Sequence, residues 1–323
     1  MIPSSACQPQ ADTHPALWDE PWSSKLHHVM GHDPAQELTP ASAEPQFEYF
    51  VGTGTINLDA GEYVYEDGRL LSQLDWETRG AALLSVGASY HPTPSWRISG
   101  KVDLAGSGDS FMEDRDWYWP ETTEWTDQSL HPGTDLSHYI NLQLTAERAV
   151  FTGTTTELFV GAGAGYTDVK WDAPGGPYIY TDQEFRDDVG FSAEGKVISY
   201  RQRVPSLYLS ASSSHTIDRL VFAANVRAGA SFGYKGVDDH WVRELRFIDR
   251  MDPAPLLGVN LTASYAVTES RALYLSTDFT QVFEADGDVN RFNTATSEDE
   301  DSSATSGADF RSLSISFGVK GTF

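Results

Sequence analysis

Two short acidic motifs in polar stretches of the chain carry residue types that handle protons. They are Asp114-Arg115-Asp116 and Asp238-Asp239-His240. In an extended chain, residues two apart face the same way, so each motif presents a pair of side chains on one face. Two carboxylates in one place compete for protons, and an Asp beside a His orients the imidazole and stabilises its charged form. The motifs suit general acid–base chemistry, although such spacings are also common in solvated acidic loops.

The remaining composition excludes several classes of function. The sequence has no Gly-x-Ser-x-Gly nucleophile elbow, no His-Glu-x-x-His zinc motif and no phosphate-binding loop. With 22 Lys+Arg against 47 Asp+Glu, the net charge is -25, which repels nucleic acid and favours a basic or neutral partner. Cys7 is the single cysteine, so an internal disulfide is excluded. No apolar run approaches the roughly 18 residues of a membrane helix.

The elements that would position the acidic motifs are long alternating strands. From residue 46 onward, apolar and polar residues alternate with a period of two, most regularly in 70–91, 218–235 and the segment that ends at Phe323. These runs exceed the usual strand of about 5–6 residues and suit membrane strands of roughly 9–11 or more. Ten strands are predicted, at 46–66, 69–91, 96–108, 134–150, 156–172, 195–214, 218–236, 244–267, 271–285 and 307–323.

The connections between these strands alternate between short and long. Short joins lie near residues 91–94, 152–156, 216–218 and 268–270, and long polar segments lie at 109–133, 172–194, 236–245 and 285–307. Outer-membrane barrels have short periplasmic turns, long outer loops and an even number of strands. We therefore predict an all-β fold, a ten-stranded antiparallel transmembrane barrel with long extracellular loops, over residues 46–323. Residues 1–45 are polar and rich in Pro, which predicts a disordered or loosely docked leader.

The alternation also predicts which side chains face lipid and which face the lumen. Eight apolar residues are assigned to the lipid face: Leu74, Trp76, Leu84, Val86, Leu313, Ile315, Phe317 and Phe323. Four charged residues are assigned to the lumen: Asp75, Glu77, Arg79 and Arg227. The register of 220–234, carried forward, would put Asp238 and His240 outside the barrel, whereas catalysis requires them inside. A bulge near Gly236 would shift the register by one residue and turn them inward.

Several longer motifs resemble the omptin family of outer-membrane proteases. They follow the family's order from about residue 47 to Phe323 and comprise 62–76, 112–117, 125–132, 178–180, 185–188, 200–203 and 238–240. Their sequences include Met112-Glu113-Asp114-Arg115-Asp116-Trp117 and Trp125-Thr126-Asp127-Gln128-Ser129-Leu130-His131-Pro132. The resemblance implies a barrel that protrudes from the bacterial outer membrane, with a protease groove facing the exterior.

The family resemblance also implies how the groove works. Asp114 and Asp116 would face Asp238 and His240, and a water between the pairs would attack the scissile carbonyl with His240 as base. No metal, no cofactor and no covalent acyl-enzyme are implied. Two further residues, Ser129 and His131, match positions that we interpret as supporting the site. The partners implied are peptides or proteins, and the protein is expected to be a monomer.

Substrate selectivity is implied by three further positions. Glu62 matches one acidic floor residue of the pocket for the residue before the cut. The second floor residue, two before Asp238, is Gly236 here, which predicts a wider tolerance than in members with two acids. Asp127 matches an acidic position linked to the residue after the cut. The acidic mouth favours cationic peptides.

The resemblance finally implies lipopolysaccharide as an activating lipid. Four residues match its contact positions: Tyr166, Asp168, Lys170 and Arg203. The alternation of residues 158–164 independently predicts that Tyr166, Asp168 and Lys170 point outward, where a cation suits a phosphorylated head group. Asp in place of the family's Glu, and Lys in place of Arg, predict weaker binding. The alternative interpretation of this group is an ordinary interfacial belt.

Two other functions stay open at this point. A catalytically silent barrel could serve as an adhesin or receptor, because fold does not fix function. Retention of all four candidate catalytic residues favours the protease. A soluble acidic β-sandwich would agree with the lack of a recognisable secretory signal, but the ten long alternating runs disfavour it.

Overall fold

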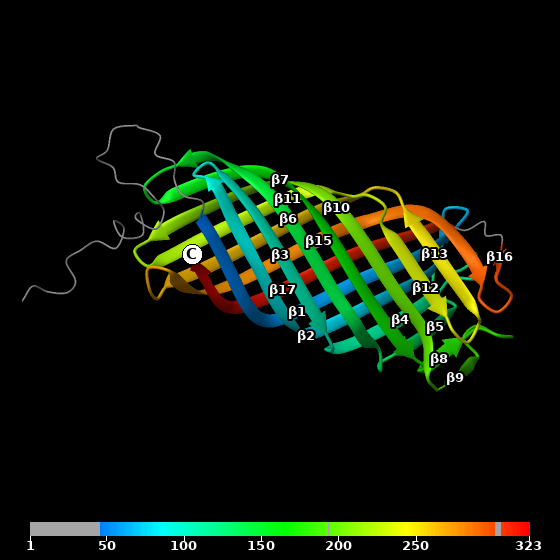
Figure 1. Ribbon diagram of the computed structural model, residues 1–323. Coiled ribbons are helices and arrows are strands. Elements are labelled where there is room, and N and C mark those ends of the chain that lie inside the picture. The colour runs from blue at the N-terminus through cyan, green and yellow to red at the C-terminus, as the bar shows by residue number, and fades with distance from the viewer. Residues whose placement is uncertain (1–45, 193, 301–304) are drawn as a thin grey trace, which may run out of the picture.

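The computed structural model describes residues 46–192, 194–300 and 305–323. Its strands close into a barrel (Figure 1). The ring consists of β1 (Gln46–Glu66), β2 (Arg69–Thr93), β3 (Trp96–Gly106), β6 (Asp135–Thr152), β7 (Thr156–Pro174), β10 (Lys196–Ile217), β11 (Leu220–Ser231), β14 (Ala254–Ala266), β15 (Arg271–Asn293) and β17 (Thr305–Thr322). All neighbours pair antiparallel, and β17 closes on β1. The predicted ten-stranded all-β barrel is confirmed. No helix in the described residues is long and apolar enough to span a membrane. The predicted leader, residues 1–45, lies outside the described residues.

Shorter strands extend the wall at one end of the barrel. These are β4 (Asp109–Asp116), β5 (Asp127–His131), β8 (Pro177–Tyr180), β9 (Asp188–Phe191), β12 (Lys235–His240), β13 (Leu245–Met251) and β16 (Glu298–Glu300). We call this the long-loop end. The short connections gather at the opposite end, where Glu48 of β1 pairs with Thr322 of β17 (Figure 1). Both acidic motifs, on β4 and β12, therefore lie at the long-loop end.

The outer wall carries an apolar band toward the short-connection end. Side chains such as Val51, Leu209 and Leu275 are exposed there, as lipid-facing positions of a barrel should be. The prediction for Leu84, Leu313, Ile315, Phe317 and Phe323 is confirmed, because all five are exposed, and Val86 is partly buried on the same face. The long-loop halves of β1 and β2 have a polar outer face and project beyond this band.

A bulge at Gly80 exchanges the inward and outward faces in the part of β2 nearer the long-loop end. Residues 79 and 80 together oppose Asn57, since Ile56 pairs with Ala81 and Leu58 with Thr78. Gly80 has φ +64 and donates its N–H to the Asn57 side chain at 2.8 Å. The prediction for Leu74 and Trp76 is therefore wrong, because both are buried inside the barrel. The lumen assignment of three other residues is wrong for the same reason: the outer wall carries Asp75, Glu77 and Arg79.

A second register change turns the Asp238–His240 motif inward. On the side of this change nearer the short connections, Arg227 and Ser231 of β11 face the lumen. On the side nearer the long loops, Tyr234 and Asp238 face the lumen. The shift occurs at Gly233, which has φ +76, three residues before the position that the sequence suggested. A single extra residue in one strand changes the face of every later side chain.

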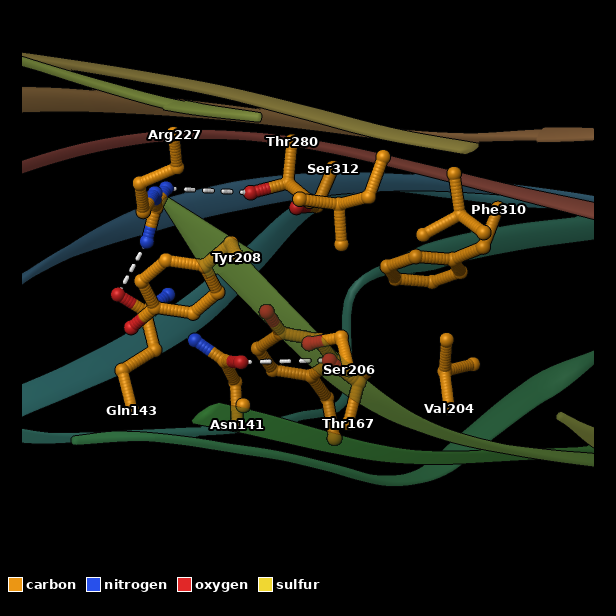
Figure 2. A pocket seen from close by; sticks show the side chains of 14 residues that line it. Asn141, Gln143, Thr167, Val204, Ser206, Tyr208, Arg227, Thr280, Phe310 and Ser312 are labelled. Atoms are coloured by element: carbon orange, nitrogen blue, oxygen red, sulfur yellow. Dashed lines mark hydrogen bonds between the residues drawn. The ribbon is translucent and has the colours of Figure 1, made fainter. Parts of the chain in front are cut away.

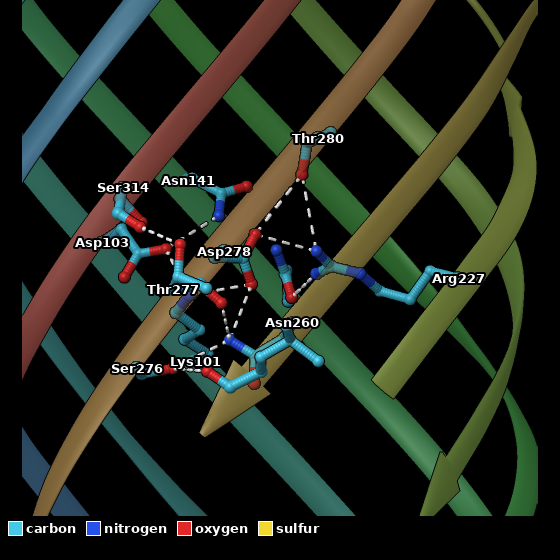
Figure 3. A network of polar contacts seen from close by, with 12 residues as sticks. Lys101, Asp103, Asn141, Arg227, Asn260, Ser276, Thr277, Asp278, Thr280 and Ser314 are labelled. Atoms are coloured by element: carbon cyan, nitrogen blue, oxygen red, sulfur yellow. Dashed lines mark hydrogen bonds and ion pairs between the residues drawn. The ribbon is translucent and has the colours of Figure 1, made fainter. Parts of the chain in front are cut away.

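The lumen at the level of the apolar band is filled with paired polar groups (Figure 3). Arg227 lies there as predicted and contacts Asp278 at 2.9 Å. Lys101 contacts Asp103 at 3.0 Å, and the Asn260 amide donates to Asp278 at 3.2 Å. Buried charges are tolerated when each has a partner, as these do. A small cavity lies beside the network, between Tyr208, Gln143 and Phe310 (Figure 2).

An aromatic layer fills the interior between this network and the long-loop end. The Trp76 ring stacks on Tyr200 with centroids 5.6 Å apart and lies 6.1 Å from Trp171. The Trp171 indole donates to the Thr78 hydroxyl at 2.8 Å. Trp76 belongs to this layer because the Gly80 bulge turns it inward, and the acidic residues lie above it.

Replacing Gly80 with Val should destabilise the barrel, because a β-branched residue at positive φ costs about 1–3 kcal/mol. The cost is conformational, since an added Cβ at Gly80 meets nothing within 4 Å. Gly106→Val is the matched control, with equally open space and no positive φ. Urea unfolding in detergent micelles, followed by tryptophan fluorescence, measures both variants. Equal midpoints for the two would contradict the bulge as the source of the register change.

Candidate active site

The two acidic motifs reach the interior of the long-loop end from different parts of the wall. Asp114 and Asp116 lie on β4, which pairs with β2 and β5. Asp238 and His240 lie on β12, which pairs with β10 and β13. Asp238 is only 2% exposed, so the register change at Gly233 has carried it from the solvent side into the barrel.

The Asp238–His240 pair is held rigidly. His240 Nε2 lies 2.5 Å from Asp238 Oδ2. The Phe247 ring packs edge-on against the imidazole, with centroids 5.4 Å apart and an interplanar angle of 72°. With Nε2 directed at the carboxylate, Nδ1 is the ring nitrogen that is positioned to exchange a proton with a ligand.

The Asp114–Asp116 pair holds protons more tightly than ordinary carboxyls. Burial raises the pKa of Asp114 well above its usual range, and the Asp116 and Asp238 carboxylates raise it further. Burial also raises the pKa of Asp116 to about 6, against hydrogen bonds from Ser72 and Tyr118 that favour its charged form. The two groups interact, so protons leave the pair as a unit rather than from either carboxyl alone.

The Asp–Asp and Asp–His pairs share one electrostatic environment. The Asp238 carboxylate acts on Asp114, and both act on Glu62, whose own burial raises its pKa well above the usual range. Such mutual effects require that the groups lie close together in a poorly solvated place. The structure therefore brings the four predicted catalytic residues together with Glu62 at the mouth of the barrel.

Ser129 and His131 lie beneath the Asp pair. Ser129 pairs with Asp114 across the β4–β5 ladder. Its hydroxyl lies 2.8 Å from His131 Nε2, and His131 Nδ1 lies 2.6 Å from the Pro174 carbonyl oxygen. The carbonyl can only accept, so Nδ1 donates and Nε2 accepts from Ser129. Burial lowers the pKa of His131, which keeps this chain of hydrogen bonds neutral.

The predicted substrate residues border the same site. Glu62 is 4% exposed, and Asp127 is buried opposite Asp116 in the β4–β5 ladder. Asp127 accepts a hydrogen bond from the Thr181 N–H at 3.1 Å, and its charge helps to raise the pKa of Asp116. No group of three or more His, Cys, Asp or Glu in the described ranges is arranged to hold a metal ion.

The four predicted lipid-contact residues form one patch on the outer wall of β7 and β10. Asp168 accepts two hydrogen bonds from Arg201, at 2.8 and 2.5 Å, and lies 3.9 Å from Arg203. Lys170 lies 3.5 Å from Asp172. Tyr166 pairs with Pro205 in the same ladder. The patch is therefore an ion-paired cluster rather than a set of separate side chains.

Several site residues were missed from the sequence. Arg201 could have been found, because it lies two residues before Arg203 and so shares its face. Ser72, which bonds to the Asp pair, and Asp249, whose charge acts on Glu62, come from other strands. Their positions depend on strand pairing, which no local pattern reveals.

Asp116→Asn should stabilise the folded barrel at pH 8. The raised pKa of Asp116 means that the folded state binds its proton more tightly than the unfolded chain, so stability falls as pH rises from about 4 through about 6. Removing the charge should recover on the order of 2 kcal/mol at pH 8 and nothing below about pH 4. Thermal unfolding across this range measures the effect, with the exposed Asp135→Asn as control. A loss of stability at pH 8 would contradict this electrostatic account.

Comparison with known proteins agrees with the barrel and the motif order. The Omptin family model matches residues 44–323. The plasminogen activator of Yersinia pestis is 26% identical over 257 residues, covering 78% of this chain and 81% of that protein. The outer membrane protease OmpP of Escherichia coli (strain K12) is 27% identical over 287 residues, covering 84% and 89%. The crystal structure of the outer membrane protease OmpT from Escherichia coli superposes with a TM-score of 0.82 at 23% identity, over 89% of this chain and 99% of that one. The protein is accordingly an outer-membrane barrel, and it belongs to the omptin family.

Proposed function

We propose that the protein is an endopeptidase that cleaves peptide bonds with a water activated between the Asp238–His240 pair and the Asp114–Asp116 pair. The observation that carries this proposal is the meeting of the two pairs in one buried place, where the Asp238 charge raises the pKa of Asp114. The names of the relatives, which are proteases, support the same reaction class.

The chemistry follows from the protonation states of the two pairs. His240 Nδ1 takes a proton from the water, and Asp238, 2.5 Å from Nε2, stabilises the imidazolium that forms. The water oxygen bonds to the scissile carbonyl carbon, and the proton shared by Asp114 and Asp116 is donated toward the developing oxyanion. Return of the His240 proton to the leaving amine then breaks the peptide bond. As the peptide bond breaks, the former carbonyl oxygen returns its proton to the Asp114–Asp116 pair, so the site is regenerated.

The charge of the mouth favours cationic substrates. Glu62, Asp127 and the two catalytic pairs place five carboxylates within one site. A cationic peptide is attracted to such a cleft and replaces part of the hydration that these groups lost on folding.

Lipopolysaccharide is proposed as the activating lipid. Lys170, Arg201 and Arg203 face outward on β7 and β10. These strands also carry Tyr200, beneath the site, so head-group binding at the patch would stabilise the wall on which the site rests. Phosphate groups suit this cluster because Arg and Lys bind them through charge-assisted hydrogen bonds.

His240→Ala should reduce peptide cleavage by at least about 100-fold, because general-base catalysis contributes roughly 10²–10⁴-fold. Ser129→Ala should cost much less, since Ser129 bonds to His131 and no covalent intermediate is expected. The measurement is a fluorogenic peptide-library digest with refolded protein and lipopolysaccharide. A His240→Ala protein that cleaves at the original rate would refute the mechanism. A wild-type protein that cleaves nothing would favour an adhesin or receptor instead.

Lys170→Ala should weaken activation by lipopolysaccharide without altering the maximal rate. One Lys near an anionic lipid surface contributes about 1 kcal/mol, so the half-activating lipid concentration should rise about fivefold. Arg148→Ala, at an exposed cation away from the patch, is the control. Equal shifts in the two variants would point to general charge attraction rather than a site.

A further inference from the structure

Asp249 lies beside Gly236 and places a carboxylate where residue 236 itself has no side chain. The two residues pair directly across the β12–β13 ladder. Asp249 is only 2% exposed. A Cβ added at Gly236 would lie 2.9 Å from Asp249 Oδ2 and 3.3 Å from the Tyr200 hydroxyl. The missing side chain at position 236 thus leaves the space into which the Asp249 carboxylate extends.

Asp249, Glu62 and Asp238 form a cluster of like charge. Burial and the Asp238 charge together raise the pKa of Asp249 to about 7, against a hydrogen bond from Ser306 that lowers it. The pKa of Glu62 is raised by its burial, then by Asp238 and by Asp249. The Asp238 charge therefore acts on carboxyl groups from both β1 and β13, and Asp249 acts on Glu62.

Within this cluster Asp238 has His240 as its partner, whereas Glu62 and Asp249 have no basic partner in the described part of the chain. Neither Glu62 nor Asp249 has a Lys or Arg among the groups that perturb it. One oxygen of Glu62 and one of Asp238 are buried without a hydrogen-bond partner within the described ranges. The Trp76 indole favours the charged form of Glu62 but supplies no net charge. Buried carboxylates left in this state are costly, and a cationic ligand group would relieve that cost.

We infer that Asp249 is a specificity residue that, together with Glu62, binds the cationic side chain of the substrate residue before the cut. This inference rests on the proposed endopeptidase function and adds to it a residue, Asp249, that supplies the second carboxylate in place of position 236. A guanidinium presents several N–H donors and can bind two carboxylates at once. Gly236 supplies the space, and the Tyr200 hydroxyl borders it.

The sequence prediction drawn from Gly236 was a wider tolerance at this pocket. On β12 alone the pocket has no second carboxylate, because residue 236 is a glycine. Strand pairing brings a carboxylate to the same place from β13. The pocket therefore keeps two acidic groups, and strong selectivity for a cation follows.

The test compares two peptides that differ only in Arg or citrulline before the cut, since citrulline has nearly the same shape without the charge. The wild-type protein should cleave the Arg peptide with the higher kcat/KM, and Asp249→Asn should lower the ratio roughly 10- to 100-fold. Asp288→Asn, at an exposed carboxylate on the neighbouring β15, should leave the ratio unchanged. An unchanged ratio in an Asp249→Asn protein that still cleaves overturns the inference and leaves the proposed function intact.

A second variant moves the carboxylate from β13 to β12. Asp249→Ala combined with Gly236→Asp removes the close approach of 2.9 Å and should restore most of the Arg preference. A folded double variant that cleaves without preference overturns the placement of the pocket. Heat-modifiable gel mobility reports folding of each variant.

Binding separates this inference from the proposed function. Fluorescently labelled versions of both peptides are titrated against His240→Ala and against His240→Ala combined with Asp249→Asn. The first protein should bind the Arg peptide more tightly than the citrulline peptide, and the second should lose most of that difference. Absence of cleavage by the wild-type protein, with this binding pattern retained, refutes the endopeptidase alone. Equal binding of both peptides to His240→Ala refutes the role of Asp249.

Discussion

The structure depends on keeping several carboxylates crowded together in a poorly solvated place. The Asp238 charge acts on Glu62, Asp114 and Asp249, and burial raises the pKa of each of these three carboxyl groups. A closed barrel can hold them there because every strand of its ring is hydrogen-bonded on both edges. The strands therefore keep the carboxyl groups close together, and the repulsion between them contributes to their raised pKa values. In the proposed function, a cationic substrate group would relieve that repulsion.

The barrel interior contains two polar regions, one in the lumen and one at the long-loop end, and their buried charges are compensated differently. In the lumen at the level of the apolar band, Arg227 and Lys101 each have carboxylate partners, so the charges balance (Figure 3). Above the aromatic layer of Trp76, Trp171 and Tyr200, the buried Glu62 and Asp249 have no Lys or Arg among the described groups that act on them. The first arrangement stabilises the fold and the second prepares a site for a ligand.

Much of this organisation could be predicted from the sequence because the period of two is a local property. The ten strands and the outward face of 313–317 follow from alternation alone. The face of Trp76 could not be predicted in this way, because a single residue at Gly80 with positive φ inverts everything beyond it. Gly233 does the same for Asp238, and there the chemistry required an inversion that the alternation did not contain. Asp249 was missed because its role depends on the strand that pairs beside Gly236.

In the proposed mechanism, water held between Asp238–His240 and Asp114–Asp116 attacks the peptide directly. Rapid-mixing kinetics with a peptide that releases a chromophore on its amine side tests this most directly, combined with mass measurement of the quenched protein. Direct attack by water predicts a linear release of the chromophore without a burst, and a protein of unchanged mass at every time. A burst equal to the enzyme concentration, with the acyl half of the peptide attached to the protein, would contradict it.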